Sequence, residues 1–123
     1  MAQLTLQSKR ILITGAAGSI GSALAKKIAE EKPATLLLLD ENESGLFDLN
    51  NEISGWTPVV ANIREYVTLQ EVFIKYKPDI VFHAAAYKHV PLMEENPNEA
   101  IKTNIGGTLN LVSLAMKYGV ERF

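Results

Sequence analysis

The chain has 123 residues, of which 47 % are hydrophobic and 21 % are charged, with a net charge of −2 and no cysteine. This composition excludes disulfides, thiolate metal sites and a basic surface for nucleic acid or anionic membranes. No apolar run reaches the roughly 20 residues of a membrane-spanning helix, and no secretory signal is present. We therefore predict a cytoplasmic protein with one domain, residues 1–123, and no membrane segment in this chain.

Short apolar runs alternate with longer amphipathic segments along the chain. In chain order, we predict a strand at 10–14, a helix at 19–31, a strand at 35–40, a helix at 42–53, a strand at 57–61, a helix at 68–76, a strand at 80–84, a helix at 96–118 and the start of a fifth strand at 121–123. Strict alternation is typical of a parallel sheet with right-handed crossovers. The expected fold is Rossmann-like α/β, a doubly wound parallel sheet with strand order 3-2-1-4.

Local signals predict where the first and third helices lie. Ile20, Leu24 and Ile28 are spaced by four, which predicts that they form the buried face of the first helix. Thr68 and Glu71 match a capping box, which predicts that the third helix begins there.

The last helix has signals at both ends and an anomaly inside. Asn96 is a suitable N-cap with Pro97 at the first helical position, and Gly119 is a natural residue just past the C-terminus. Gly106 and Gly107 lie in the predicted interior, where each glycine costs about 1 kcal/mol relative to alanine. We therefore expect close packing against another element at these glycines.

A glycine-rich segment, TGAAGSIG at 14–21, follows the first strand and opens the first helix. Glycines in this context permit a tight turn, let the backbone approach a pyrophosphate and allow Gly21 to lie close to the strand. The helix N-terminus offers N–H groups and the positive end of its dipole to phosphates. A glycine-rich turn without a ligand is the alternative, and a P-loop is excluded because no Gly-Lys-Ser/Thr follows.

Asp40 ends the second strand, nineteen residues after Gly21. A carboxylate at this place accepts hydrogen bonds from the adenosine ribose and repels a 2′-phosphate. Glu41 and Glu43 add negative charge, and residues 33–63 contain neither Arg nor Lys. These features favour NAD over NADP as the dinucleotide. In the alternative interpretation, Asp40 is a strand-end carboxylate that caps the next helix.

Three further segments carry a family resemblance: Asn62-Ile63-Arg64, AAAYKHVPLMEENP at 84–97 and KTNIGGTLNL at 102–111. With them, the chain resembles the extended short-chain dehydrogenase/reductases. It is most similar to their polysaccharide-biosynthesis branch, the nucleoside-diphosphate-sugar 4,6-dehydratases (lyases) and epimerases (isomerases). The resemblance covers nearly the whole chain. Its specific part is the segment from residue 84 onward, because TGxxGxxG marks only the superfamily.

The resemblance implies a set of cofactor contacts. Relatives place an Asp against the adenine amino group where this chain has Asn62, whose amide oxygen still accepts one hydrogen bond. The implied cofactor-binding residues are Gly15, Gly18, Ser19, Ile20, Gly21, Asp40, Asn62, Ile63, Ala84, Ala85 and Ala86. Of these, Ser19 and Ile20 would act through backbone N–H groups, and the three alanines would line the cofactor at the end of the fourth strand.

Two residues are candidates for the substrate side of the site, and a third is a candidate for support of the active site. Lys88 and His89 lie on the loop after the fourth strand, where the resemblance implies that a sugar nucleotide enters, and Lys88 would meet a diphosphate. The alternative is a solvated lysine and a histidine packed on Pro91. Asn104 matches an asparagine that supports the active site in the family.

The family's catalytic Ser or Thr, Tyr, Lys and acidic residues would all fall beyond Phe123. We therefore expect the chain to hold the dinucleotide, to be inactive alone and to meet a nucleotide-sugar only in the complete enzyme. A non-enzymatic module that senses NAD or docks a partner, and an enzyme assembled from two chains, remain alternatives. The apolar fourth strand (Ile80, Val81 and Phe82) would form an open edge, which predicts homo-oligomers through that edge.

Overall fold

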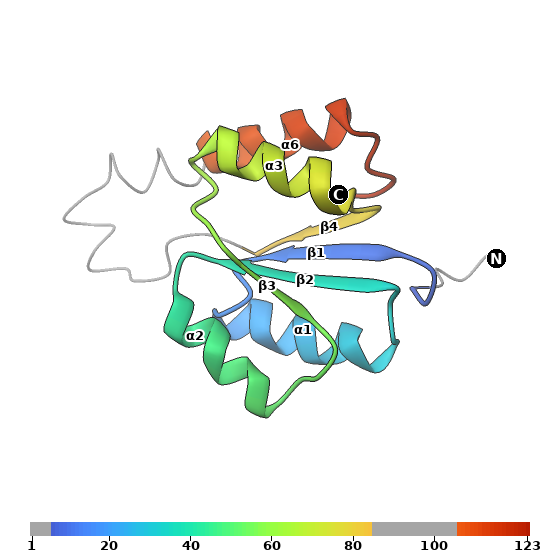
Figure 1. The fold of residues 1–123 in the computed structure, drawn as a ribbon, viewed down its shortest axis with the longest axis vertical. Coiled ribbons are helices and arrows are strands. Elements are labelled where there is room, and N and C mark those ends of the chain that lie inside the picture. The colour runs from blue at the N-terminus through green and yellow to red at the C-terminus, as the bar shows by residue number, and fades with distance from the viewer. Residues whose placement is uncertain (1–5, 85–105) are drawn as a thin grey trace.

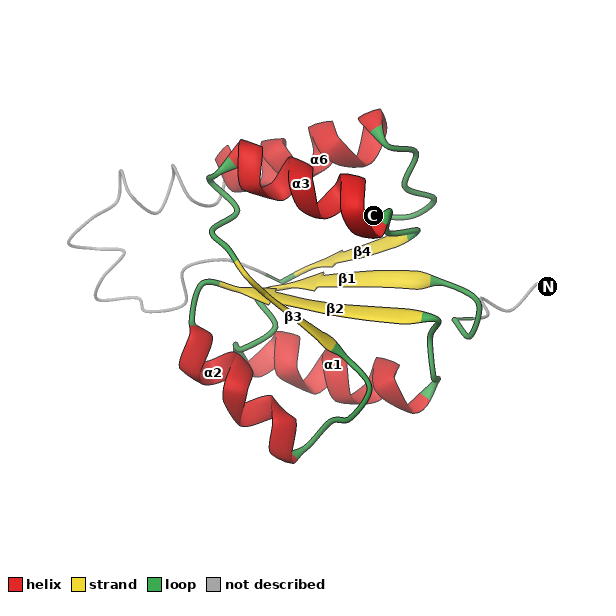
Figure 2. Ribbon diagram, in the orientation of Figure 1, coloured by secondary structure: helices red, strands yellow, loops and turns green. Residues whose placement is uncertain are grey.

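The computed structural model describes residues 6–84 and 106–123. The elements are β1 (Arg10–Thr14), α1 (Ser19–Glu30), β2 (Thr35–Asp40), α2 (Glu43–Asp48), the 3₁₀ turn η1 (Leu49–Asn51), β3 (Thr57–Val60), α3 (Tyr66–Tyr76), β4 (Ile80–His83) and α6 (Gly107–Lys117). The four strands form one parallel sheet in the order β3-β2-β1-β4, so the predicted fold class and strand order are confirmed. Helices α1 and α2 cover one face, and α3 and α6 cover the other (Figures 1 and 2).

The two central strands have a hydrophobic core on each face. Alternate side chains of β1 and β2 point to opposite sides of the sheet, which is why both strands read as continuous apolar runs. The core beneath α1 and α2 contains Ile11, Ile13, Ala25, Ile28, Leu36, Leu38 and Leu46. The core beneath α3 and α6 contains Leu12, Leu37, Leu39, Leu69, Phe73, Leu111 and Leu114.

The buried face of α1 differs from the predicted one. The prediction is wrong at Ile20, whose side chain is 67 % exposed, while Leu24 is only partly buried. The residues that face the sheet are Gly21, Ala25 and Ile28. A bulky side chain cannot face the sheet in the first turn, because this turn lies against the backbone of the preceding loop. The small residues at positions 21 and 25 therefore determine which face of α1 packs against the sheet.

The capping box predicted at Thr68 is also wrong. Helix α3 begins at Tyr66, its N-cap is Glu65, and no side chain caps it. Thr68 lies inside the first turn, where its Oγ1 donates to Oε2 of Glu65 at 3.5 Å. The helix starts earlier because Asn62 turns the chain: its side-chain oxygen accepts from the N–H of Arg64, and its carbonyl accepts from the N–H of Glu65.

Other boundaries move by smaller amounts. The helix predicted at 42–53 is α2 followed by η1, and its N-cap Asn42 accepts a hydrogen bond from the N–H of Gly45. Strands β3 and β4 each end one residue before the predicted limit. Gly119 lies just past α6 with a φ of +70°, as predicted for a residue that ends a helix. The predicted start of this helix at Asn96 lies outside the described residues.

The outer edge of β4 is paired at its beginning. Ile80 forms a single parallel bridge with Arg122, and the N–H of Val81 donates to the carbonyl of Arg122 at 3.0 Å. The predicted start of a fifth strand is confirmed in this bridge. The predicted open edge is wrong at Ile80 and Val81, which are only 2 % and 1 % exposed. Oligomerisation through the remainder of the edge stays a prediction.

Within residues 6–84 and 106–123, no helix is both long and apolar enough to cross a bilayer.

Candidate functional site

The glycine-rich loop leaves the carboxyl end of β1 and enters α1 through a hydrogen-bonded turn. Gly15 has a φ of +69°, in the left-handed region that side chains other than glycine rarely adopt. The N–H of Gly18 donates to the carbonyl of Gly15 at 3.1 Å, and the N–H of Ala16 donates to the carbonyl of Leu39 at 3.1 Å. These bonds hold the loop against the ends of both central strands.

Gly21 shows why the first turn of α1 contains no bulky residue on its inner side. A β-carbon at this position would overlap the carbonyl oxygen of Gly15 and lie 2.7 Å from its carbonyl carbon and 3.0 Å from Cα of Ala16. All three neighbours are backbone atoms, which cannot move aside as a flexible side chain can. The close approach of helix and loop is the role that the sequence predicts for Gly21.

The N-terminus of α1 is a suitable place for an anion. Its N-cap is Gly18, which has no side chain to cap the helix, and its first turn has no acidic residue. Helical geometry leaves the N–H groups of Ser19, Ile20 and Gly21 without an acceptor inside the helix. The side chains of Ser19 and Ile20 are exposed, so this turn is open to solvent. Three N–H donors and the positive end of the helix dipole therefore face the same side.

Asp40 lies directly beside this loop. Its Oδ2 accepts a hydrogen bond from the N–H of Ala17 at 3.0 Å, and its Oδ1 accepts one from the N–H of Asn42 at 2.9 Å. Each carboxylate oxygen has a further lone pair for a ligand hydroxyl. The alternative interpretation of Asp40 as the cap of the next helix is wrong, because Asn42 caps α2.

Asn62 follows β3 at the same edge of the sheet. Its Nδ2 donates to Oε2 of Glu41 at 2.9 Å, and its Oδ1 accepts from the N–H of Arg64 at 2.9 Å. From the sequence, we expected Glu41 only to add negative charge near Asp40. Its contact with Asn62 was missed, because nothing in the sequence pairs two residues that lie twenty-one positions apart and follow different strands.

Ile63 has a packing role in this structure. Its side chain is 4 % exposed, and a β-carbon on Gly107 would overlap its Cγ1 and Cδ1. Its carbonyl accepts a hydrogen bond from Nδ2 of Asn110 at 2.9 Å. The predicted close packing is therefore found at Gly107. At Gly106, nothing among the described residues lies within 4 Å of a β-carbon.

A polar bridge between the ends of β1 and β4 was not predicted. Thr14 Oγ1 lies 2.7 Å from Nδ1 of His83, and Nε2 of His83 lies 2.9 Å from Oγ1 of Thr108 in α6. Burial lowers the pKa of His83 below its ordinary value of 6.5, so the imidazole is held neutral. A continuous run of apolar residues before His83 marks the strand but does not indicate this bridge.

Ala84 follows β4, and its N–H donates to the carbonyl of Thr14 at 3.1 Å, which places it next to the start of the glycine loop. The other candidates lie outside the described residues: Ala85, Ala86, Lys88, His89 and Asn104.

A loop of glycines between the first strand and first helix, with an acidic residue at the end of the second strand, defines a Rossmann-like domain of the dinucleotide-binding class. The family model described as "polysaccharide biosynthesis protein" matches residues 11–123. The chain belongs to this family, and the predicted resemblance to the polysaccharide-biosynthesis branch of the short-chain dehydrogenase/reductases is confirmed.

Curated proteins that resemble the chain are longer than it is. The chain is 40 % identical, over 96 % of its residues, to the capsular polysaccharide biosynthesis protein CapD of Staphylococcus aureus, of which it covers 21 %. It is 34 % identical, over 93 % of its residues, to UDP-N-acetylglucosamine 4,6-dehydratase (inverting) of Campylobacter jejuni, of which it covers 34 %.

A solved structure of UDP-glucose 4-epimerase from Thermus thermophilus, in complex with NAD, superposes on the chain with a TM-score of 0.80 and 29 % identity. This superposition covers 90 % of the chain and 35 % of the epimerase. The chain thus spans between about a fifth and about a third of the length of these proteins.

Proposed function

We propose that this chain is the NAD-binding part of a nucleotide-sugar 4,6-dehydratase or epimerase of polysaccharide biosynthesis. The observation that carries the proposal is the hydrogen bond from the Ala17 N–H to Asp40, which holds a carboxylate beside the open N-terminus of α1. A ligand with a diphosphate next to a ribose matches these two groups. The NAD complex of the epimerase supports this ligand, and the name of the dehydratase relative supports the nucleotide-sugar activity.

Each part of the site would hold one part of the dinucleotide. The N–H groups of Ser19, Ile20 and Gly21 would bind the pyrophosphate, and Gly15 and Gly18 would let it approach the backbone. Asp40 would accept hydrogen bonds from the adenosine ribose, and Asn62 would accept one from the adenine amino group. Bound NAD supplies a hydride acceptor for oxidation of the sugar. The contribution of this chain is to bind and orient the dinucleotide at the carboxyl edge of the sheet.

Selection of NAD over NADP would come from charge. A 2′-phosphate on the adenosine ribose would lie against the carboxylate of Asp40, with Glu41 and Glu43 close in sequence and residues 33–63 without any basic side chain. Two anions at hydrogen-bonding distance repel each other, and no nearby cation in that segment offsets the repulsion.

Isothermal titration of the purified chain with NAD and with NADP tests the proposal. We expect NAD to bind more tightly, and we expect Asp40→Asn to weaken NAD binding about tenfold, equivalent to about 1.4 kcal/mol. Asp48→Asn removes an exposed carboxylate from α2 and is the matched control, with the affinity of the unmodified chain. Absence of binding to either dinucleotide would contradict the proposal.

A further inference from the structure

Side chains join the end of β2 to the end of β3. The register pairs Asp40 with Val60, so Glu41 and Asn62 both follow their strands at the same edge of the sheet. There, Nδ2 of Asn62 donates to Oε2 of Glu41 at 2.9 Å. Glu41 is exposed and Asn62 is half-buried, so the pair lies at the surface, where a ligand can reach it.

The two partners of Asn62 determine which way its amide points. The oxygen and nitrogen of an amide occupy similar space, so hydrogen-bond partners decide the orientation. Glu41 requires a donor and therefore takes the nitrogen, while the N–H of Arg64 requires an acceptor and takes the oxygen. Both requirements give the same orientation. The oxygen retains one lone pair for a ligand.

The order of the strands indicates which part of a ligand would meet this lone pair. From β1 to β2 to β3, the edge of the sheet carries the glycine loop, then Asp40, then Asn62. On the proposed function, on which this step rests, these would meet the pyrophosphate, the ribose and the base in turn. The base would then face the amide oxygen of Asn62, which is an acceptor. An amino group at C6 of the purine fits this environment, and a 6-oxo group does not.

We infer that Glu41 is a specificity-determining residue, which selects adenine over 6-oxopurines by orienting the amide of Asn62. Without Glu41, only the N–H of Arg64 holds the amide, and rotation can present Nδ2 to the base as a donor for a 6-oxo group. Glu41 is thus a positioning residue that acts through Asn62.

The test compares binding of NAD with binding of nicotinamide hypoxanthine dinucleotide, in which an oxo group replaces the amino group at C6. Isothermal titration of the unmodified chain should show a preference for NAD of about tenfold, because one hydrogen bond is lost and two acceptors face each other. Glu41→Ala should reduce the preference to about threefold or less. Asp48→Ala removes the same charge from nearby α2 and should keep the preference of the unmodified chain.

A second pair of variants separates orientation from charge. In the Asn62→Asp background the side chain has only acceptors, so no orientation remains to be set, and adding Glu41→Ala should leave the preference unchanged. Glu41→Gln retains an acceptor oxygen and should restore most of the preference. Circular dichroism should show the same fold in all variants, because Glu41 is exposed and an Asp at position 62 keeps an acceptor oxygen for the N–H of Arg64.

An unchanged preference in Glu41→Ala would overturn the inference, as would an equal loss in the Asn62→Asp background. These outcomes differ from failure of the proposed function, in which the unmodified chain would bind neither dinucleotide.

Discussion

Oγ1 of Thr14 lies 2.7 Å from Nδ1 of His83, so the ends of β1 and β4 are joined by side chains as well as by the sheet. Thr14 is fully buried, and a buried hydroxyl that loses its partner costs about 1–3 kcal/mol. We therefore predict that His83→Phe lowers the free energy of unfolding by about that amount. Urea denaturation followed by circular dichroism measures it.

A double variant tests whether loss of the hydrogen bond between Thr14 and His83 causes the destabilisation. Thr14→Val removes the hydroxyl that His83→Phe leaves without a partner. We expect the double variant to be less destabilised than the sum of the two single variants, because replacing both partners leaves no unsatisfied group. Additive effects would show that the bond contributes little.

The same histidine predicts a pH dependence of stability. Burial lowers the pKa of His83 in the folded chain below its ordinary value of 6.5, so the unfolded chain binds its proton more readily. Stability should therefore be complete above about pH 6.5 and decrease as the pH falls from there toward the folded pKa. Urea midpoints at pH 8 and pH 5.5 measure the decrease. His83→Gln, which does not titrate, should show a smaller change over this interval, and an equal change would contradict the assignment.

Gly21→Ala tests the contact between the glycine loop and α1. A β-carbon there would overlap the carbonyl oxygen of Gly15, and the rigid backbone on both sides prevents relief. We predict a loss of about 3 kcal/mol in unfolding free energy, at the upper end of overpacking effects, together with loss of dinucleotide binding. Gly106→Ala is the control: its backbone is helical and no described atom lies within 4 Å, so a gain of up to about 1 kcal/mol is expected. Equal effects of the two variants would contradict the contact.

Gly107 and Ile63 form a second tight contact, between α6 and the segment after β3. A β-carbon on Gly107 would overlap two side-chain carbons of Ile63, so Gly107→Ala should destabilise the chain by about 1–3 kcal/mol. Ile63→Ala removes those two carbons and should by itself be destabilising, since Ile63 is buried. In the double variant the costs should not add, because the new methyl group fills part of the space. A thermal denaturation series of the four proteins measures this coupling.

The strand order and the position of Asp40 beside the glycine loop were predicted from patterns in the sequence. Continuous apolar runs marked β1 and β2, and the glycines with Asp40 marked the end of the sheet where the loop and carboxylate meet. The glycines are fixed by local backbone geometry, and the position of Asp40 follows from the parallel pairing of β1 with β2, whose carboxyl ends meet at one edge of the sheet. The structure therefore places Asp40 beside the loop, as the spacing predicts.

The side chains that were missed make contacts between distant segments. His83 bridges Thr14 and Thr108, and Glu41 holds Asn62, yet none of these pairs is close in sequence. The error at Ile20 has the same origin, because its exposure follows from the contact of Gly21 with Gly15 and not from the period of the helix. A contact between two single residues that are distant in sequence produces no periodic pattern, so one sequence does not predict it.

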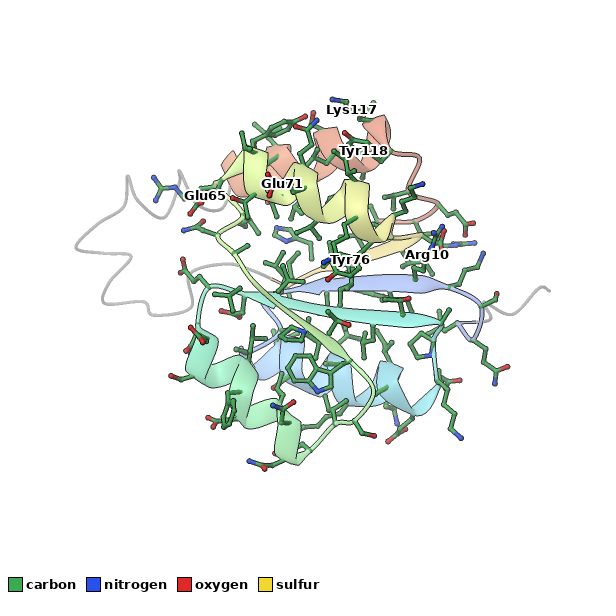
Figure 3. All side chains as sticks on the ribbon, in the orientation of Figure 1. Arg10, Glu65, Glu71, Tyr76, Lys117 and Tyr118 are labelled. Atoms are coloured by element: carbon green, nitrogen blue, oxygen red, sulfur yellow. The ribbon has the colours of Figure 1, made fainter. Side chains whose placement is uncertain are left out.

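Arg10, which is labelled in Figure 3, lies at the amino end of β1, at the opposite end of the sheet from the glycine loop. Its guanidinium forms an ion pair with Asp79. Asp79 accepts from Nε and Nη2 of Arg10 at 3.2 and 3.0 Å and from its backbone N–H at 2.8 Å. The hydrogen bonds to the Arg10 guanidinium hold the pKa of Asp79 below its ordinary value of 3.8.

The lowered pKa of Asp79 determines how the stability of the chain changes at acidic pH. The unfolded chain takes up a proton at Asp79 more readily, so the contribution of the pair is present above about pH 3.8 and is lost as the pH falls from there through the folded pKa. Asp79→Asn removes the titrating group, so its unfolding midpoint in urea should change less between pH 5 and pH 2.5 than that of the unmodified chain. If the two proteins lose stability in parallel over this interval, the pair does not contribute to the acid sensitivity of the chain.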